Sequence, residues 1–287
     1  MNGSKKMSKV TFVSALFDIN RVDGRKWDEY LKWFDTTLKL KVPMVLFVTE
    51  DIVDFVRERR GDDITVNMDG GVGGSWLVND QTEIIVQTVN DIPYYGLKDQ
   101  IQDILDSDQY KKDMADPQRI ECKQAMYPII QYSKFPWLTQ AAAMNPHESD
   151  YFFWLDAGGS RFFEDYDLTQ NYPSEEAKKA LDDMGDSFLL QMNTEYYTDL
   201  ANAKTLSTDY LYDNRSYVLG SMFGGHKKSL FRVCDMVHDV LMNDMIANNT
   251  INNEQIALGY LIKKYPDEFS LYERTNQEHM ALFHELG

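Results

Sequence analysis

The chain has 287 residues, of which 43% are hydrophobic and 13% aromatic, so it can bury a large core and is not an intrinsically disordered protein. Its 46 acidic residues outnumber its 29 basic ones, which gives a net charge of −17 and a pI near 4.6. A surface this acidic repels phosphate backbones and anionic lipid, so we expect neither nucleic-acid nor membrane-surface binding. The longest apolar run near the start, Val10 to Phe17, is too short to cross a bilayer and lacks a signal-peptide cleavage pattern. We therefore expect a soluble, cytoplasmic protein without a transmembrane segment.

The first half of the chain alternates between strand and helix patterns. Residues 1–9 are predicted to form a flexible tail, and 10–287 a single domain, because no linker or repeat divides them. The predicted elements are a strand over Val10 to Phe17, a helix from Trp27 to Leu38, a buried strand over 44–48 (MVLFV), a short helix over 51–59 and a strand over 63–66 (DITV). This β-α-β-α-β order predicts an α/β fold with a central, mostly parallel sheet flanked by helices.

The second half continues this pattern after a glycine-rich stretch. Asn67 to Trp76 lacks the lysine of a phosphate-binding loop and is predicted to be a flexible loop, with a lid or an inserted hairpin as alternatives. The further predictions are helical pieces over 96–145 broken by Pro117, Pro128 and Pro136, a central strand at YFFWLD, an acidic loop and helix over 164–185, strands near 187–192 and 215–223, a helix after Gly225, and a final helix capped by Asn252 and Asn253 and ended by Pro266. Cys122 and Cys234 are expected to be reduced core thiols.

Three predicted strand ends carry polar or glycine residues: SALFDINR, WLDAGGSR and GSMFGGHKK. In open α/β sheets, ligands bind where strands end at their carboxyl edge. Asp156, at the end of a buried strand, can hold Mg²⁺ or Mn²⁺ or bond a ribose hydroxyl. The small residues after it allow a bulky ligand to reach the backbone. The alternative is that Asp156 caps a turn and that the glycines supply positive φ angles.

The other candidate positions also have a structural explanation beside the functional one. Gly224 and Gly225 allow close approach of a ligand, but a tight strand-to-helix turn explains them equally, and His226 alone is weak evidence for a metal. Glu254 lies in the first turn of the final helix, where its interaction with the helix dipole is stabilising. The functional interpretation places its carboxylate in the cleft, as a base or as a stabiliser of developing positive charge.

Several of these segments resemble known proteins. VTFVSALFDINR, SKFPWL, FFWLDAGGSRF and NNEQIAL resemble the HtrL/YibB (WlaTC) group of predicted glycosyltransferases, over most of residues 10–60 and 120–275. The segment from VLGSMFGGHKK to YPDEFSLY is similar to the C-terminal half of GT-A glycosyltransferases of the blood-group type. The resemblance implies a GT-A-like fold and a hexosyl- or pentosyltransferase. Such an enzyme would move a sugar from a nucleoside diphosphate sugar, UDP-linked, to a hydroxyl of a glycan acceptor in glycan biosynthesis.

The resemblance also implies roles for individual residues. Ser14, Ala15, Phe17, Asp18 and Arg21 would lie against the nucleotide base and ribose, Asp156 with Ala157 and Gly158 would take the place of the Asp-x-Asp motif, Lys134 would lie near the diphosphate, Gly224 and Gly225 would leave room for the sugars, and Glu254 would face the anomeric carbon or the acceptor hydroxyl. The resemblance to the blood-group type favours retention of the anomeric configuration over inversion. The other functions considered are a nucleotidyltransferase of sugar phosphates and a non-catalytic carbohydrate-binding protein.

The implied metal site departs from the family pattern, because Gly158 stands where the motif has its second acid. One carboxylate with diphosphate oxygens and water can still hold Mn²⁺ or Mg²⁺, so a divalent metal on Asp156 is the expectation. The alternative is metal-independent binding in which Lys134 and Arg161 neutralise the diphosphate. His279 and His284 are further candidate metal ligands near the end of the chain.

Overall fold

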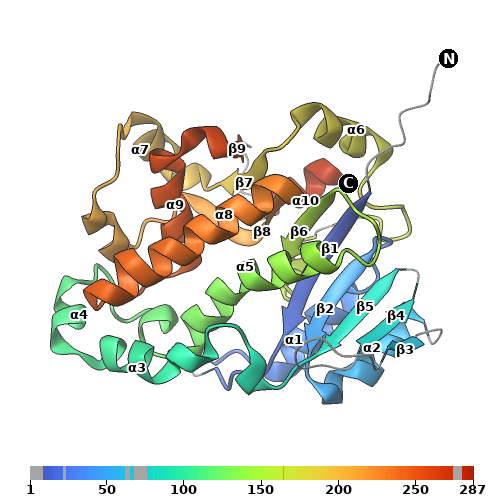
Figure 1. Ribbon diagram of the computed structural model, residues 1–287, viewed down its shortest axis with the longest axis horizontal. Helices are drawn as coiled ribbons and strands as arrows, with labels where there is room; N and C mark the ends of the chain where they lie inside the picture. Colours follow the sequence, from blue (N-terminus) through green and yellow to red (C-terminus); the bar gives the residue numbers. More distant parts are fainter. Residues whose placement is uncertain are drawn as a thin grey trace.

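The computed structural model describes residues 9–21, 24–61, 65–67, 76–79, 81–163, 165–273 and 280–287. Within them nine strands form one sheet in the spatial order β3-β4-β5-β2-β1-β6-β8-β7-β9 (Figure 1). The strands are β1 (Val10–Leu16), β2 (Met44–Val48), β3 (Thr65–Asn67), β4 (Trp76–Asn79), β5 (Thr82–Val86), β6 (Tyr151–Leu155), β7 (Phe188–Met192), β8 (Val218–His226) and β9 (Phe269–Tyr272). The helices are α1 (Trp27–Thr37), α2 (Val53–Arg60), α3 (Lys98–Asp106), α4 (Asp108–Asp113), α5 (Met126–Met144), α6 (Glu175–Met184), α7 (Tyr197–Asn202), α8 (Lys227–Asp239), α9 (Glu254–Lys264) and α10 (Ala281–Leu286).

Most strands of the sheet run in one direction. β5, β2, β1 and β6 are parallel neighbours, and β7 is parallel to β9. β8 is antiparallel to both β6 and β7, so β7 has the direction of β6 and β8 alone is reversed among these seven strands. The hairpin of β3 and β4 extends the sheet beyond β5. The predicted α/β fold with a mostly parallel central sheet is confirmed.

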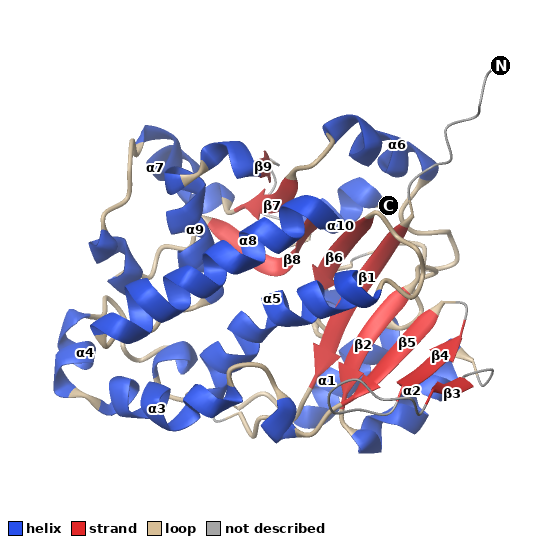
Figure 2. Cartoon of the chain, in the orientation of Figure 1, coloured by secondary structure: helices blue, strands red, loops and turns tan. Residues whose placement is uncertain are grey.

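Helices cover both faces of this sheet (Figure 2). Side chains alternate along a strand, so Val13 of β1 faces one helical layer and Phe12 the other. The first layer contains α3, α5, α8 and α9, and the second contains α1, α2, α6 and α10. The inner strands are buried on both sides, which explains why MVLFV and YFFWL are almost entirely apolar. No helix in the described part of the chain is long and apolar enough to span a membrane.

The third parallel strand differs from the prediction. The expected strand over 63–66 corresponds to β3, which lies at the sheet edge, and residues 62–64 are outside those the structure describes. The third parallel strand is β5, which follows the hairpin. Antiparallel pairing of β3 with β4 agrees with the inserted hairpin considered for the glycine-rich stretch, although its residues 68–75 lie outside the described ranges.

The helical regions also differ from the prediction at two places. α5 continues through Pro128 and Pro136, whereas both were expected to break it. Pro128 lies in the first turn, where its missing N–H costs no intrahelical bond, and Pro136 is held within a helix whose residues are largely buried. Pro266 ends α9 as expected, but α9 is not the last element, because β9 and α10 follow it. Cys122 and Cys234 are buried free thiols, as predicted.

We predict that Gly224→Ala destabilises the protein by about 3 kcal/mol, the upper end of the usual cost of overpacking a core. A Cβ at Gly224 would lie 2.1 Å from the carbonyl oxygen of Phe152 and 2.6 Å from Cα of Phe153, and both atoms belong to the neighbouring strand. Urea unfolding measures the change. Gly96→Ala is the matched control, because a Cβ there has no atom within 4 Å. Equal stabilities of the two variants would contradict the tight approach of β6 and β8.

Candidate active site

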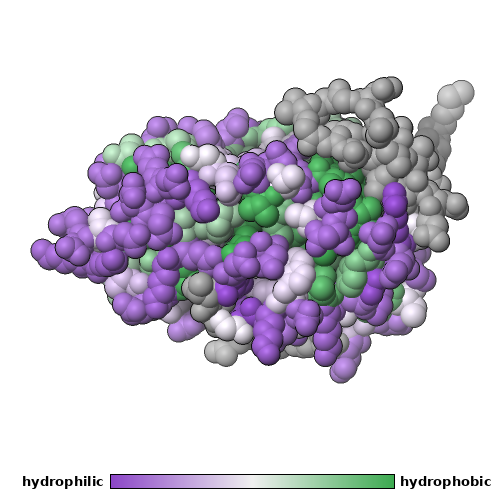
Figure 3. Space-filling view, turned by 90° about the horizontal axis from the view of Figure 1, so that it is seen from below, coloured by the Kyte–Doolittle hydropathy of each residue, from purple (hydrophilic) through white to green (hydrophobic). Residues whose placement is uncertain are grey.

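A cavity of about 490 Å³ lies at the carboxyl edge of β1 and β6. The arrowheads of these strands point downward in Figure 2, so this edge is the face seen from below in Figure 3. That face exposes hydrophobic residues near its centre, bordered by hydrophilic ones. Lining residues come from the end of β1, from α1, α5 and β6, from the start of β8 and from the start of α9. The cavity is therefore placed where open α/β sheets bind their ligands.

Lys134 is the central charge of this cavity. Its ammonium lies 2.9 Å from Oδ1 of Asp156 and 2.7 Å from Oε1 of Glu254, and it donates a hydrogen bond of 2.9 Å to the carbonyl of Gly220. Lys134 belongs to α5, Gly220 to β8 and Glu254 to α9, and Asp156 directly follows β6. One ammonium therefore holds together the two acids that the sequence analysis singled out.

The electrostatics of this triad follow from burial. The side chains of Lys134 and Glu254 are 6% and 1% exposed, whereas that of Asp156 is 37% exposed. Burial raises the pKa of Glu254, and the ammonium of Lys134 opposes that rise. Burial by itself lowers the pKa of Lys134, but the charges of Asp156 and Glu254 outweigh it and raise that pKa. The two acids therefore favour the charged form of Lys134, and its ammonium favours the ionised form of Glu254 against the larger effect of burial.

Asp156 occupies a defined position at the strand end. Its Oδ1 also accepts a hydrogen bond of 2.6 Å from the indole N–H of Trp154, and its backbone N–H donates to the carbonyl of Ser221. Its own carbonyl accepts from the N–H of Gly159, which closes a tight turn after β6. The apolar strand thus fixes a carboxylate whose other side remains open to the cavity.

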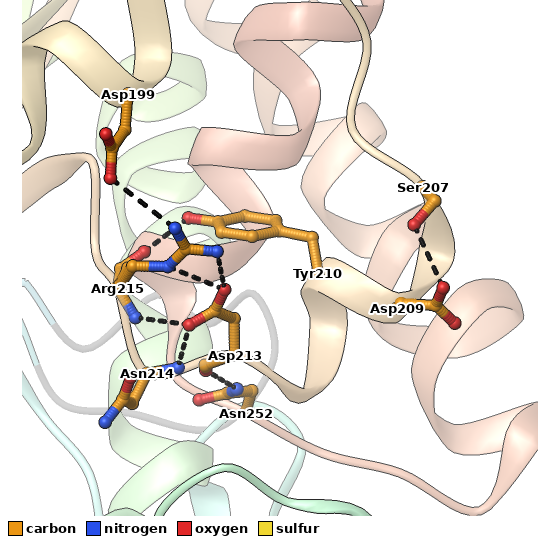
Figure 4. A network of polar contacts seen from close by, with 8 residues as sticks. All are labelled: Asp199, Ser207, Asp209, Tyr210, Asp213, Asn214, Arg215 and Asn252. Carbon is orange, nitrogen blue, oxygen red and sulfur yellow. Dashed lines mark hydrogen bonds and ion pairs between the residues drawn. The ribbon is translucent and has the colours of Figure 1, made fainter. Parts of the chain in front are cut away.

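The segment before α9 fixes Glu254. The side chain of Asn253 caps the helix by accepting from the N–H of Ile256, as predicted. Asn252 donates to the carbonyls of Leu211 and Asp213, which ties this segment to the loop drawn in Figure 4.

That loop is rigidified in turn by Asp213. Its carboxylate accepts from the guanidinium of Arg215 and from two backbone N–H groups, and Arg215 also pairs with Asp199 (Figure 4). The side chain of Asn252 and the ion pair between Asp213 and Arg215 therefore stabilise the segment that immediately precedes Glu254.

Gly220 was not recognised in the sequence. A Cβ at Gly220 would lie 2.3 Å from Oε1 of Glu254, so only glycine leaves room for the carboxylate at this position. The sequence does contain a signal for it, because a glycine within a predicted strand often marks a position where a ligand or another part of the chain approaches the backbone closely. The sequence instead suggested that Gly224 and Gly225 leave room for the ligand.

Gly224 and Gly225 do not line the cavity. β8 is reversed, so its carboxyl end lies at the opposite edge of the sheet, and its first residues, Leu219, Gly220 and Ser221, reach the site. A Cβ at Gly225 would lie 2.2 Å from the carbonyl oxygen of Ser187. These two glycines are thus required by the neighbouring strands, and they are not in a turn, because β8 continues to His226.

The site residues predicted at the end of β1 and directly after it line the cavity, with the exception of Ser14. Ala15, Phe17, Asp18 and Arg21 line it, together with Ala157 and Gly158 after β6. Ser14 does not line it. Its hydroxyl is buried on the sheet, and none of the described residues forms a hydrogen bond with it.

Further lining residues were not predicted as site residues. Arg25 precedes α1, Trp27 and Tyr30 belong to α1, and Gln131 lies one helical turn before Lys134 on α5. Oε1 of Gln131 and Oε2 of Glu254 are buried atoms that have no hydrogen-bond partner within the described ranges. The sequence signal was available for Gln131, because residues three apart on a helix share a face.

The described residues show no preformed site for a divalent cation at Asp156. Oδ1 of Asp156 and Oε1 of Glu254 are both bound to an ammonium, and no group of three His, Cys, Asp or Glu side chains suited to a metal occurs in the described ranges. A second acid at Gly158 is disfavoured, because a Cβ there would lie 3.2 Å from Trp33. His284, in α10, forms a hydrogen bond of 3.3 Å through Nε2 with the carbonyl of Phe162, and His279 falls outside the described residues.

One known protein family matches nearly the whole chain. A model described as "Bacterial protein of unknown function (HtrL_YibB)" matches residues 8–284. The chain belongs to this HtrL_YibB family. The predicted resemblance is thereby confirmed over nearly the whole sequence, including the segment between residues 65 and 95 that the motifs did not cover.

Other comparisons give more distant similarities. The search of curated proteins gave no match. Mouse xyloside xylosyltransferase 1, in its apo form, is 9% identical with a TM-score of 0.42, over 93% of this chain and 85% of that one. Core-mannan synthase A from Aspergillus fumigatus, in a form with Mn and GDP, is 9% identical with a TM-score of 0.48, over 95% and 74% of the two chains. At these TM-scores the description of the fold rests on the strand order and directions given above.

We predict that Lys134→Met lowers the free energy of unfolding by about 3–5 kcal/mol, because it leaves a buried carboxylate without its partner. It should also make stability fall more steeply with pH. Without the ammonium the pKa of Glu254 rises further, so the folded state retains a proton that the unfolded state releases above about pH 4.3. Stability is then lost as the pH rises from that value through the folded-state pKa. Urea unfolding of the variant and the parent between pH 5 and 8 measures the slope.

The control for this prediction is the double variant Lys134→Met, Glu254→Gln. It removes the titrating group, so the additional pH dependence should disappear. Lys178→Met serves as a surface control, because Lys178 pairs only with the exposed Glu175 among the described residues. A flat profile for Lys134→Met would contradict the ion triad.

Proposed function

We propose that the protein is a glycosyltransferase that moves a sugar from a nucleoside diphosphate sugar to a hydroxyl of a glycan acceptor. The observation that carries this proposal is the meeting of Asp156 and Glu254 on one lysine in a cavity at the carboxyl edge of the sheet. The cavity volume lies within the range of small-molecule sites. UDP-linked donors are tested first, because the family resemblance implied them. Whether the sugar is a hexose or a pentose is left to the same test.

The two carboxylates suit the charge changes of glycosyl transfer. The bond between the anomeric carbon and the diphosphate oxygen breaks, a bond to the acceptor oxygen forms, and the transition state has oxocarbenium character. Asp156, open to the cavity, stabilises the developing positive charge electrostatically. The acceptor hydroxyl loses a proton during the reaction, and Glu254 is the carboxylate placed to accept it in an inverting reaction. In a retaining reaction the same group would stabilise positive charge on the donor sugar.

The environment of Glu254 supports a role in moving a proton. Oε1 is bound by Lys134, whereas Oε2 is buried and has no hydrogen-bond partner among the residues that the structure describes. A carboxyl group whose pKa is raised above its ordinary value is closer to the basicity that proton transfer near neutral pH requires. Gln131 presents a second unpartnered acceptor atom, Oε1, in the lining of the cavity. Sugar hydroxyls can donate to both oxygens.

We predict that Glu254→Gln lowers kcat for transfer or donor hydrolysis by about 10²–10⁴-fold, the usual contribution of a general base, and leaves nucleotide binding nearly unchanged. Release of the nucleoside diphosphate from a panel of UDP-, GDP- and CDP-sugars measures turnover, and calorimetry with the nucleotide measures binding. Glu175→Gln, a surface change on α6, is the control.

Two results would reject the proposed function. One is the absence of binding for every nucleotide sugar of the panel. The other is full turnover by Glu254→Gln. Release of pyrophosphate from a nucleoside triphosphate and a sugar phosphate would instead identify a nucleotidyltransferase.

A further inference from the structure

The charged residues of the cavity divide into two groups. The inner group is the triad of Lys134, Asp156 and Glu254, in which two carboxylates face one ammonium. Its formal charge is therefore −1 while both acids are ionised. Beside it lie the unpartnered acceptor oxygens Oε2 of Glu254 and Oε1 of Gln131. Phosphate oxygens are acceptors and negatively charged, so this inner region repels a diphosphate.

The outer group consists of arginines at the exposed part of the cavity. Arg25 and Arg161 both line the cavity and are exposed. Arg161 stacks over Trp33 at 5.0 Å and over Phe162 at 4.7 Å from the ring centroids. Arg21 stacks over Tyr127 at 4.6 Å and donates to the hydroxyl of Tyr30. Aromatic rings thus support guanidinium groups on the lining of the cavity.

The guanidinium groups of Arg25 and Arg161 are available to bind an anion. The guanidinium groups of Arg25 and Arg161 line the same cavity, and partial burial, with a further contribution from the charge of Arg25, lowers the pKa of Arg161. In the part of the chain that the structure describes, neither forms an ion pair with a carboxylate. Asp18 and Glu121 also line the cavity, and the weaker attraction that Arg161 receives from an acid comes from Asp156. An anion between the two guanidinium groups would relieve their repulsion, and their planar donors match phosphate oxygens.

We propose that Arg25 and Arg161 bind the diphosphate of the donor, in place of a divalent cation on Asp156 and in place of Lys134. This inference rests on the proposed function and assigns the charge that neutralises the leaving group. Lys134 then serves the two carboxylates, and the sugar lies between the arginines and the triad. Stabilisation of the departing diphosphate by these two cations requires no metal ion.

The test is calorimetric titration of the full chain with UDP and with uridine, in EDTA and in Mn²⁺. The dissociation constant for UDP is expected to be the same in both buffers. Arg161→Gln and Arg25→Gln should each weaken UDP binding by about tenfold to a hundredfold, the range for one charged hydrogen-bonded contact, and leave uridine binding unchanged. Arg57→Gln, which affects a partly exposed arginine paired with Asp54 on α2 and outside the cavity lining, is the matched control. Arg161→Lys should retain part of the affinity, because it keeps the charge and loses the planar fork.

Each outcome decides a separate question. UDP binding that requires Mn²⁺, or that is unaffected by Arg161→Gln and Arg25→Gln, would overturn the arginine assignment and leave the proposed function standing. Equal losses for UDP and uridine would show a general disturbance of the cavity and would also overturn it. If UDP, GDP and CDP all fail to bind the parent protein in either buffer, the proposed function itself fails.

Discussion

The candidate site depends on one buried ammonium shared by two carboxylates. Transfer of the charges of Lys134 and Glu254 from water into a protein interior costs several kcal/mol for each ion, and the attraction between opposite charges offsets that cost only when the geometry is good. Lys134 meets this requirement through its contacts with Asp156, Glu254 and the carbonyl of Gly220. Removal of the lysine would leave the two acids without their shared partner and would raise the pKa of Glu254 further.

The main outline of the fold is contained in the sequence. Unbroken apolar runs such as MVLFV and YFFWL indicate strands buried on both faces, and the alternation with helical patterns indicates an α/β sheet. Strand direction and edge position are not local properties, so the reversal of β8 and the place of β5 as third parallel strand were not predictable. Pro136 shows the same limit, because surrounding burial outweighs the local preference to break a helix.

The site was predictable in part, for related reasons. Asp156 and Glu254 follow rules that hold locally: one ends a buried strand and the other begins a capped helix. Their meeting on Lys134 is a long-range contact that no spacing reveals. Gly224 and Gly225 were given a ligand role because a strand's carboxyl end was assumed to face the cavity, and the reversal of β8 brings Gly220 there instead. Arg25 lies in a polar stretch without any pattern, and only the fold brings it to the cavity that Arg161 also lines.

A crystal structure of the protein with an unreactive nucleoside diphosphate sugar bound would test this account most directly. The account predicts electron density for the sugar beside Glu254, with the ammonium of Lys134 still between the two acids. A ligand bound outside this cavity, or a lysine side chain turned away from both carboxylates, would contradict it.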